Sequence, residues 1–342
     1  MSRTGRADGR TTPVTPMAGE VLADRHGRVK RKLRLSITDR CNFRCRYCMP
    51  DHPQWLPKKE LLTREEMLLL AGLFVDAGIE AIRVTGGEPL LRADAVERVA
   101  ALNNLRSRGL RRLSMTTNAS RLAPLLERLR ASGLDDLNIS LDALDPGRFR
   151  VLRGQGIEPV LEGIGEALRL RVPFKLNTVL IRGENDCEIL SLTAWAMERG
   201  IPLRFIEYMP LDTPGRWSSE AVVHEDEVLA TLRRRYRVEP LRRTSDPATE
   251  FLLDGHYRLG LITTVSRPFC SSCNRLRLTA VGDLYTCLFS KSGARLRGTL
   301  RAGATPEELS SIIRARVWAK EPGYIALRAP VERPIRMHAI GG

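Results

Sequence analysis

Short apolar segments alternate with amphipathic helical patterns about six times between residues 33 and 207, and this alternation limits the possible folds more than any other feature. Strands that are connected through helices run parallel in one sheet, and such sheets collect their chemistry at the carboxyl ends of the strands. Six units are too few to close a barrel, so we predict an α/β fold, an open (βα)6 partial TIM barrel. The predicted strands are 33–38, 81–85, 113–117, 136–141, 174–181 and 203–207, and the predicted helices are 64–76, 93–107, 122–132, 159–171 and 188–199.

Changes in composition along the chain suggest the domain boundaries. Residues 1–30 are rich in Gly, Thr, Pro and Arg and have little apolar pattern, which predicts a basic, disordered N-terminal tail. The barrel is assigned to 31–210, because Pro, Gly and Arg interrupt the alternation after Met209. The remainder divides into a C-terminal region, 211–330, and a terminal segment, 331–342.

The composition excludes several classes of protein. Hydrophobic residues make up 43% of the 342 residues, which is enough for a packed core, and no apolar run is long enough to cross a membrane. The first thirty residues contain no apolar leader, so we expect a cytoplasmic protein. The formal net charge of +15 favours an anionic substrate, with nucleic acid as the alternative ligand.

Six of the seven cysteines form two groups, one with the spacing C-x3-C-x2-C directly after the first predicted strand and one with C-x2-C-x13-C. An odd number of cysteines in a chain without a leader argues against a disulfide framework. Closely spaced thiolates hold iron–sulfur clusters, and a cluster with three protein ligands keeps one iron open for a substrate or cofactor. The groups are Cys41, Cys45 and Cys48, and Cys270, Cys273 and Cys287.

Zinc is the alternative metal for both groups. The second group has no histidine between Asn274 and Tyr285 to complete a closed zinc site, so a second iron–sulfur cluster fits it better. Cys187 stands alone and is predicted to be a structural or partly exposed thiol.

Two further motifs follow strands or cysteines. The segment Thr85-Gly86-Gly87-Glu88-Pro89 ends the second predicted strand, and paired glycines there would let a ligand approach the backbone closely, although a tight turn explains them equally well. Arg275 and Arg277 alternate directly after Cys273, so both guanidinium groups would lie on one face of a short strand. Such paired arginines suit phosphate oxygens, whereas a solvated basic face is the ordinary alternative.

The first cysteine group and the Gly-Gly-Glu-Pro motif together resemble the radical S-adenosylmethionine (SAM) enzymes. That resemblance implies a partial barrel of radical SAM type with a C-terminal extension that carries the second cluster. It also implies a [4Fe–4S] cluster on Cys41, Cys45 and Cys48, whose open iron binds SAM and cleaves it to methionine and a 5′-deoxyadenosyl radical. By the same resemblance, SAM would contact Tyr47, Gly87, Ser140 and Met209.

Within that superfamily, the chain from about residue 30 onward resembles the GTP 3′,8-cyclases, lyases of molybdenum cofactor biosynthesis. One departure is Ala119, which stands where a glycine often follows Thr-Thr-Asn. The matching runs are 35–45, Gly86-Gly87-Glu88-Pro89, Thr116-Thr117-Asn118, 175–179, 204–207, 270–278 and Gly341-Gly342.

This closer resemblance implies GTP as the substrate. The radical would abstract the ribose 3′ hydrogen, and the C3′ radical would attack guanine C8 to give 3′,8-cyclo-7,8-dihydro-GTP. A second [4Fe–4S] cluster would hold the guanine, and the terminal glycines would reach into the active site. The GTP contacts would be Arg34, Arg83, Thr116, Lys175, Arg204, Arg275, Leu276 and Arg277, with catalytic roles for Arg275, Arg277, Gly341 and Gly342.

The resemblance also implies partners: an external electron donor and transfer of the product to the next molybdopterin-pathway enzyme, with a homodimer left open. No membrane or nucleic-acid partner is expected. The sequence contains no G-x-x-x-x-G-K-[ST] run, so arginines and lysines rather than a P-loop would neutralise the triphosphate.

Two other functions stay open at this point. A radical SAM enzyme that modifies a peptide is one, although such enzymes often have more cysteines in the C-terminal region than the three found here. A zinc-stapled nucleic-acid-binding protein is the other, favoured by the net charge of +15, but it leaves the Gly-Gly-Glu-Pro motif unexplained.

Overall fold

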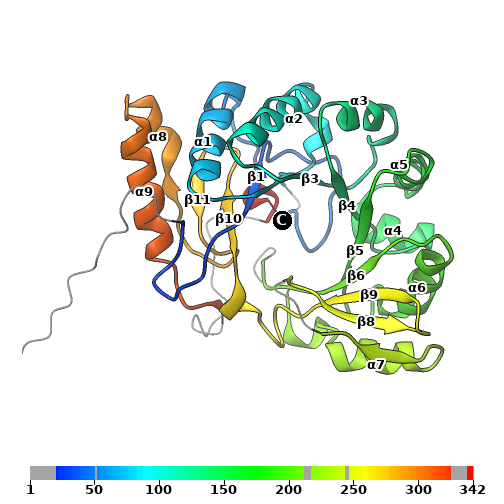
Figure 1. Ribbon diagram of the computed structural model, residues 1–342. Coiled ribbons are helices and arrows are strands. Elements are labelled where there is room, and N and C mark those ends of the chain that lie inside the picture. The colour runs from blue at the N-terminus through cyan, green and yellow to red at the C-terminus, as the bar shows by residue number, and fades with distance from the viewer. Residues whose placement is uncertain (1–20, 51, 212–216, 243–245, 325–336, 342) are drawn as a thin grey trace, which may run out of the picture.

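The computed structural model describes residues 21–50, 52–211, 217–242, 246–324 and 337–341. These residues form one curved sheet of twelve strands in the order β12-β11-β10-β1-β2-β3-β4-β5-β6-β9-β8-β7. Helices cover its outer, convex face, and the concave face encloses the interior of the barrel (Figure 1). No helix in the described part of the chain is long and apolar enough to cross a membrane.

The six central strands pair side by side in chain order, and every pair is parallel. No pairing joins β9 to β10 among the described residues, so the barrel stays open. This confirms the predicted open (βα)6 partial TIM barrel. The strands are β1 (Lys32–Ser36), β2 (Ala81–Thr85), β3 (Arg112–Thr117), β4 (Asp136–Ser140), β5 (Phe174–Leu180) and β6 (Leu203–Glu207).

The helices between these strands fall close to their predicted positions. Helix α1 occupies the predicted range, and a capping box fixes its start, because the Thr63 side chain accepts a hydrogen bond from the Glu66 backbone. The helices of this part are α1 (Arg64–Asp76), α2 (Ala95–Asn103), α3 (Leu126–Ala131), α5 (Glu158–Arg169) and α6 (Ile189–Glu198).

Helix α4 (Pro146–Arg153) is absent from the predicted elements. It is short and rich in arginine, so its apolar stripe is weak in the sequence. Its boundaries are nevertheless well marked: the Asp145 side chain caps its first turn, and Gly154 ends it in the left-handed conformation with φ 71°.

The region after residue 211 extends the sheet at both edges. Strand β9 (Tyr257–Ile262) pairs in parallel with β6, and β8 (Thr249–Leu253) and β7 (Val238–Pro240) follow it antiparallel. At the other edge, β10 (Arg275–Leu278) pairs in parallel with β1. The remaining elements are β11 (Asp283–Tyr285), β12 (Ala294–Arg295), α7 (Glu225–Arg233), α8 (Leu296–Arg301), α9 (Pro306–Trp318) and α10 (Met337–Ile340).

Short 3-10 helices occupy several connections between these elements. They are η1 (Lys58–Glu60), η2 (Pro89–Leu91), η3 (Asn104–Arg108), η4 (Ala123–Leu125), η5 (Asp186–Glu188), η6 (Ser219–Ala221) and η7 (Cys270–Ser272).

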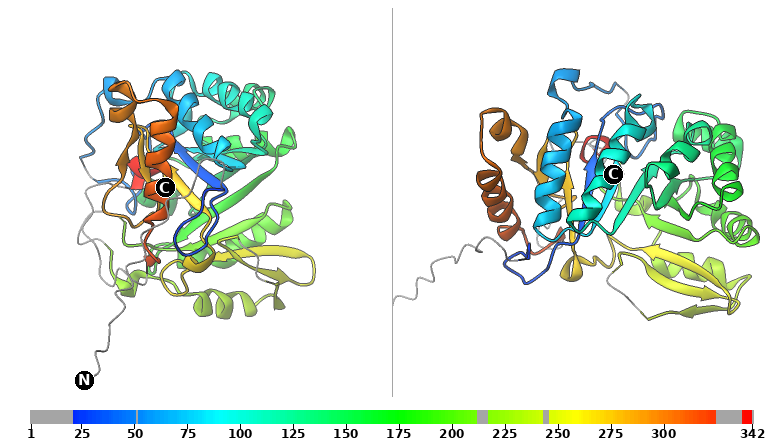
Figure 2. Two further views of the ribbon diagram at one scale, coloured as in Figure 1. Left: turned by 60° about the vertical axis from the view of Figure 1, so that its left-hand side comes forward. Right: turned by 45° about the horizontal axis from the view of Figure 1, so that its top comes forward.

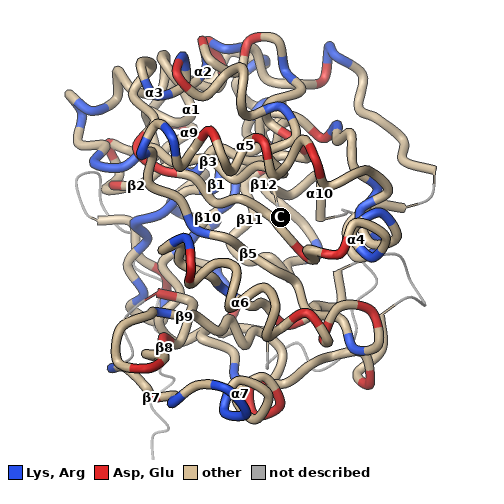
Figure 3. The backbone as a smooth tube through the Cα atoms, turned by 90° about the vertical axis from the view of Figure 1, so that its right-hand side faces the viewer, with Lys and Arg blue, Asp and Glu red and all other residues tan. Residues whose placement is uncertain are grey.

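Alternation along the strands separates the hydrophobic core from the interior of the barrel. In β1, Leu33 and Leu35 are fully buried in the core between sheet and helices, whereas Arg34 between them lines the inner cavities. The same alternation places charged residues inside the barrel on neighbouring strands, and Figure 3 marks the Lys and Arg positions along the chain.

Residues 21–30 belong to the folded domain, so the predicted tail boundary at residue 30 is wrong for this segment. Leu22 is 1% exposed and its backbone N–H donates to the Ala77 carbonyl at 3.1 Å. Ala23 and Val29 form an antiparallel bridge. The sequence appears polar here because the buried charges of this segment pair with one another. Residues 1–20 lie outside the described residues, as do 331–336 and Gly342 of the terminal segment.

Candidate active site

One cavity of about 210 Å³ in the barrel is lined by residues from most of the predicted sites. Its walls include predicted SAM contacts, predicted GTP contacts and the second cysteine group. These residues come from four strands and four connecting segments, although they are up to 253 positions apart in the chain. They are Arg34, Tyr47, Thr116, Ser140, Met209, Cys270, Cys273, Arg275, Arg277 and Cys287.

A second cavity of about 140 Å³ lies beside it, toward the amino ends of the strands, and nine of the eighteen residues that line it are charged. Arg34, Asn177 and Arg275 line both cavities, so the two adjoin. The cations of the second cavity include three further predicted GTP contacts and two residues that the sequence analysis did not name. They are Lys32, Arg34, Arg83, Arg112, Lys175, Arg204 and Arg275.

The first cysteine group lies in the loop after β1. Cys45 is buried, and Cys41 and Cys48 are partly buried. Burial, and then the neighbouring Cys45, raise the pKa of Cys41 to about 12. The pKa values of Cys45 and Cys48 are also raised by burial. Thiolates that repel one another in a buried loop are stabilised by a bound cationic centre, so this donor set fits an iron–sulfur cluster.

A buried ion pair, missed by the sequence analysis, holds this loop against the barrel. Arg153 of α4 pairs with Asp142 at 2.8 Å, and both side chains are almost fully buried. The Tyr47 hydroxyl donates to Asp142 at 2.8 Å, and Arg153 donates to the Ser140 carbonyl at 3.2 Å. Two predicted SAM contacts, Tyr47 and Ser140, are therefore positioned by one arginine. Asp142 lies just after β4, where a functional carboxylate is expected, but nothing local in the sequence marks Arg153.

The paired glycines allow the loops after β1 and β2 to touch. A Cβ on Gly87 would lie 2.3 Å from the Arg40 carbonyl oxygen, and one on Gly86 would lie 2.4 Å from that of Thr38. Glu88 is buried and accepts hydrogen bonds from the Thr117 hydroxyl and the Asn118 backbone, both at 2.7 Å. The motif thus joins the ends of three strands. Gly87 lines neither cavity, and its contact with SAM stays a prediction.

The second cysteine group lies beside Arg275 and Arg277, the arginines predicted to bind phosphate, as expected from their order in the sequence. All three cysteines are partly buried and face the same cavity as Arg275 and Arg277. Burial raises the pKa of Cys273, but the positive charges of Lys320 and Arg275 outweigh it and lower the pKa to about 7. A thiol that is already inclined to ionise suits metal binding. Within the described residues, no group of three His, Cys, Asp or Glu side chains is arranged to hold a single metal ion.

The predicted GTP contacts belong to an excess of positive charge inside the barrel, where seven cations line the second cavity with only two carboxylates, Asp136 and Asp246. Burial lowers the pKa of Arg34 well below its ordinary value, and the charge of Arg277 lowers it further. Burial and then the charge of Arg204 lower the pKa of Lys175. Such a cluster of cations is stabilised by a polyanion, because the anion offsets both the desolvation and the mutual repulsion.

Several buried polar atoms in this region have no hydrogen-bond partner among the described residues. They are Thr116 Oγ1, Asn177 Oδ1 and one terminal nitrogen of Arg83. Buried polar atoms are almost always paired in folded proteins, so unpaired ones at a cavity wall indicate a ligand. Asn177 was missed by the sequence analysis, although it follows the matching Lys175 in β5 at the spacing that places two side chains on the same face.

Leu276 is the one predicted GTP contact whose side chain lies away from the cavities. It is fully buried, packs in the hydrophobic core and lines neither cavity. It alternates with Arg275 and Arg277, which face the barrel interior, so its own side chain faces the other side of β10. Only its backbone remains available for a contact with substrate.

Helix α10 lies inside the barrel (Figure 1, Figure 2). The Gly341 carbonyl oxygen accepts hydrogen bonds from Arg34, at 3.4 Å, and from Arg277. Gly341 adopts φ 76°, and a Cβ there would lie 3.0 Å from the Thr85 side chain, so glycine suits this position. Gly342 lies outside the described residues.

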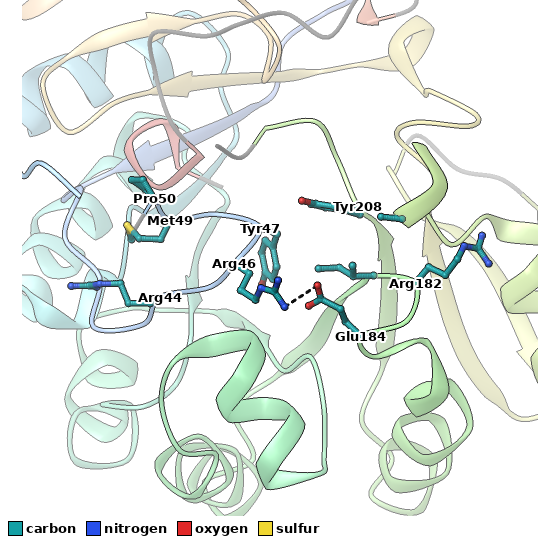
Figure 4. A pocket seen from close by; sticks show the side chains of 10 residues that line it. Arg44, Arg46, Tyr47, Met49, Pro50, Arg182, Glu184 and Tyr208 are labelled. Atoms are coloured by element: carbon teal, nitrogen blue, oxygen red, sulfur yellow. Dashed lines mark ion pairs between the residues drawn. The ribbon is translucent and has the colours of Figure 1, made fainter. Parts of the chain in front are cut away.

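A further cavity of about 490 Å³ lies on the other side of Tyr47 (Figure 4). Arg46, from the first cysteine loop, pairs there with Glu184 at 3.1 Å. Tyr47 lines both this cavity and the one that contains the second cysteine group, so the two cavities meet at this residue. Cys187 is exposed and takes part in neither.

Comparison with known proteins agrees with this geometry. Residues 35–196 match the Radical SAM superfamily, and residues 201–326 match Molybdenum Cofactor Synthesis C. The chain is 15% and 14% identical to two solved structures of Streptococcus suis SuiB, one bound to S-adenosylmethionine and one to the precursor peptide SuiA. The TM-scores are 0.56 and 0.60. The superpositions cover 80% and 89% of this chain, and 65% and 68% of the SuiB chains. At this level of identity, the two structures show the fold alone.

Curated relatives are much closer in sequence. GTP 3′,8-cyclase of Streptomyces coelicolor is 45% identical over 94% of this chain and 96% of its own length. GTP 3′,8-cyclase of Rhodopirellula baltica is 43% identical over 98% of this chain and 96% of its own. Human molybdenum cofactor biosynthesis protein 1 is 46% identical over 92% of this chain, but over 50% of its own length. The chain therefore belongs to the GTP 3′,8-cyclase family of the radical SAM superfamily.

Proposed function

We propose that the protein converts GTP to 3′,8-cyclo-7,8-dihydro-GTP in the first step of molybdenum cofactor biosynthesis, with two [4Fe–4S] clusters and SAM. The carrying observation is the pair of adjoining cavities, which unites predicted SAM contacts, the second cysteine group and a cluster of cations. Neither a peptide substrate nor a nucleic-acid ligand is favoured, since full-length relatives more than 40% identical are cyclases.

The residues of the first site fit a cluster held by Cys41, Cys45 and Cys48 with SAM beside it. When bound, this pair supplies the 5′-deoxyadenosyl radical that removes the ribose 3′ hydrogen. The chain's own part is positional: Tyr47, Ser140 and Met209 line the cavity, and the Asp142–Arg153 pair fixes the first two. Together with Gly87, these three residues are the proposed SAM contacts.

The substrate site is proposed to extend from the shared cavity into the cationic one. Arg34, Arg83, Lys175 and Arg204 would bind triphosphate oxygens through charge-assisted hydrogen bonds. Thr116 and Asn177 would pair their buried, unpartnered side-chain atoms with the nucleoside. Arg275 and Arg277 would lie between the triphosphate and the second cluster, and Leu276 would contribute backbone only.

The second cluster is proposed on Cys270, Cys273 and Cys287, with its open iron toward the guanine. These cysteines and the arginines of β10 share one cavity, so base and phosphates could be held at the same time. The Gly341 carbonyl, which accepts hydrogen bonds from Arg34 and Arg277, would orient both guanidinium groups toward the substrate. Gly342 would extend this segment.

The proposed boundaries are 31–210 for the barrel and 211–330 for the C-terminal region, followed by a terminal segment that contributes to the site. Cleavage of SAM consumes an electron, so we also propose an external one-electron donor. The cyclised nucleotide would pass to the next enzyme of the pathway. A homodimer stays a prediction.

The experiment uses protein purified and reconstituted without oxygen and supplied with SAM, a reductant and GTP deuterated at the ribose 3′ carbon. We expect about eight irons and about eight sulfides per chain, as two [4Fe–4S] clusters require. We also expect deuterium to appear in 5′-deoxyadenosine as GTP is consumed. Deuterium retained in the nucleotide product would contradict abstraction at C3′, and about four irons would contradict the second cluster.

A pair of cysteine variants controls that experiment. Cys45→Ala removes a buried member of the first group, whereas Cys187→Ala removes an exposed thiol outside both cavities. Loss of SAM cleavage in the first variant and full activity in the second is the expected result. Equal activity in both would contradict the assignment of the first cluster.

A further inference from the structure

Three buried cations surround the second cysteine group, and no sequence motif marks them. Arg28, Lys30 and Lys320 are 8%, 0% and 2% exposed. Arg28 and Lys30 belong to the N-terminal segment, and Lys320 follows α9, so two distant parts of the chain meet at this site.

The contacts of these cations reach all three cysteine positions. Arg28 donates to the Cys270 carbonyl at 2.8 Å, and Lys30 Nζ donates to the Cys273 carbonyl at 2.9 Å. Lys320 Nζ lies 3.6 Å from the Cys273 sulfur, to which it donates. Lys320 also donates to the carbonyl of Thr286, the residue before Cys287.

The charges of this group are unbalanced within the protein. Asp24, 1% exposed, accepts hydrogen bonds from Arg28 and Lys30, both at 2.7 Å. Lys320 has no carboxylate within salt-bridge distance among the described residues. Three buried cations therefore face one carboxylate, and a buried excess of positive charge is costly unless an anionic group offsets it. The thiolates of a bound cluster would be that group.

We propose that Arg28, Lys30 and Lys320 are positioning residues of the second iron–sulfur cluster, with Lys320 also setting its reduction potential. This rests on the proposed function, because it assumes a cluster on Cys270, Cys273 and Cys287. A positive charge and a hydrogen bond at a ligand sulfur favour the more negative, reduced cluster and so raise the potential. The side chains of Arg28 and Lys30 hold the cysteine loop in place through their hydrogen bonds to the Cys270 and Cys273 carbonyls.

The test isolates the second cluster in full-length protein in which Cys41, Cys45 and Cys48 are changed to Ala. In that background, Lys320→Met removes the charge and both hydrogen bonds but keeps a side chain of similar length. The midpoint potential of the remaining cluster is expected to shift to more negative values. Iron retained after gel filtration is expected to fall severalfold below the parent's about four atoms per chain.

Lys291→Met is the matched control, because Lys291 is exposed, lies four positions after Cys287 and carries the same charge. It should leave the potential and the iron content unchanged. Lys320→Arg, which restores the charge, should recover most of the potential. An unchanged potential and iron content in Lys320→Met, or equal changes in Lys291→Met, would overturn the proposal.

Two further measurements keep the outcomes distinct. If Lys320→Met does not fold, as judged by its melting curve, Lys30→Met replaces it and should lose iron as severely, through the lost bond to the Cys273 carbonyl. Unchanged iron retention in Lys30→Met would then overturn the proposal. A parent protein that binds zinc, or no iron, contradicts the two-cluster function itself and not the role of the cations alone.

Discussion

At the scale of single residues, the site depends on charges that are buried in pairs or in clusters. The Asp142–Arg153 pair holds Tyr47 and Ser140. The barrel cations, by contrast, outnumber the carboxylates near them and are the proposed contacts of the triphosphate. The paired charges fix the geometry of the site, whereas the excess cations are the ones proposed to bind the substrate.

Replacing Arg153 tests the role of a charge that is buried in a pair. In Arg153→Met, Asp142 stays buried without its partner, which is expected to cost about 3–5 kcal/mol of unfolding free energy. SAM affinity should fall as well, because Tyr47 loses its fixed position. Denaturant unfolding and equilibrium dialysis with SAM measure the two effects. Arg150→Met, an exposed change on the same helix, serves as the control, and equal stability of both variants would refute the argument.

Replacing Arg275 tests the role of a cation that belongs to the excess positive charge of the barrel. Arg275→Ala should weaken GTP binding roughly 10- to 100-fold, the usual range for a charge-assisted hydrogen bond of about 1.5–3 kcal/mol. SAM cleavage in the absence of GTP should change little. Isothermal titration with GTP and an assay of 5′-deoxyadenosine separate these readouts. Unaltered GTP affinity would remove Arg275 from the phosphate site.

At the scale of elements, the barrel strands deliver their functional residues only because the loops after them pack tightly together. Gly86 and Gly87 bring the loop after β2 against the loop that carries the first cysteines. On the outer face, capping and ion pairs fix the helices, as at the start of α7, where the His224 backbone donates to Glu227 at 2.9 Å.

Gly87→Ala tests the contact between these loops. Its Cβ would lie 2.3 Å from a backbone oxygen, so the loops must separate, and we expect a loss of unfolding free energy together with at least tenfold slower SAM cleavage. Gly165→Ala in α5 is the control, since nothing lies within 4 Å of its added Cβ. That change should stabilise the protein by roughly 0.5–1 kcal/mol, the usual helical preference of Ala over Gly.

The start of α7 should respond to acid. Hydrogen bonds from Arg182, and then from the His224 backbone, lower the pKa of Glu227 from 4.5 to about 2. Its contribution to stability is therefore complete above the unfolded pKa of 4.5 and is lost as the pH falls toward about 2. The difference in unfolding free energy between the parent and Glu227→Gln should shrink from pH 7 to pH 3. A difference independent of pH would refute this.

At the scale of the whole molecule, the chain encloses a cationic interior by extending one sheet at both edges. The C-terminal region supplies β10 beside β1 and β9 beside β6. Arg275 and Arg277 thus join Arg34 on a neighbouring strand and belong to the same inner surface. The barrel and the C-terminal region share one sheet and one site.

This interior should make global stability depend on polyanions. Inorganic triphosphate carries the charge of the substrate without its base, so it should raise the melting temperature of the protein, and the rise should shrink as NaCl is added. Thermal melts at several triphosphate and salt concentrations measure this. Inorganic sulfate at equal ionic strength is the control, and an equal shift with sulfate would argue against a site built for a chain of phosphates.

Much of this arrangement could be predicted from local sequence. The strand–helix alternation gave six strands in their correct order, and the cysteine spacing and Gly-Gly-Glu-Pro identified the family. What escaped prediction depends on contacts between distant residues. Arg153 contacts Tyr47, 106 positions away, and Lys320 contacts Cys273, 47 positions away. No motif in the neighbouring sequence indicates a role for Arg153 or for Lys320. Residues 21–30 read as a tail because their charged side chains pair within the segment and with distant residues, as Arg28 does with the Cys270 and Pro322 carbonyls.

An open barrel of this kind necessarily leaves two sheet edges unclosed, and such edges can recruit strands from other molecules. Here the outermost strands are β12, with two residues, and β7, with three, one of which is Pro240. Short edges offer few free backbone groups, and proline offers no N–H. The extension that carries the second cysteine group thereby also protects the protein against edge-to-edge aggregation.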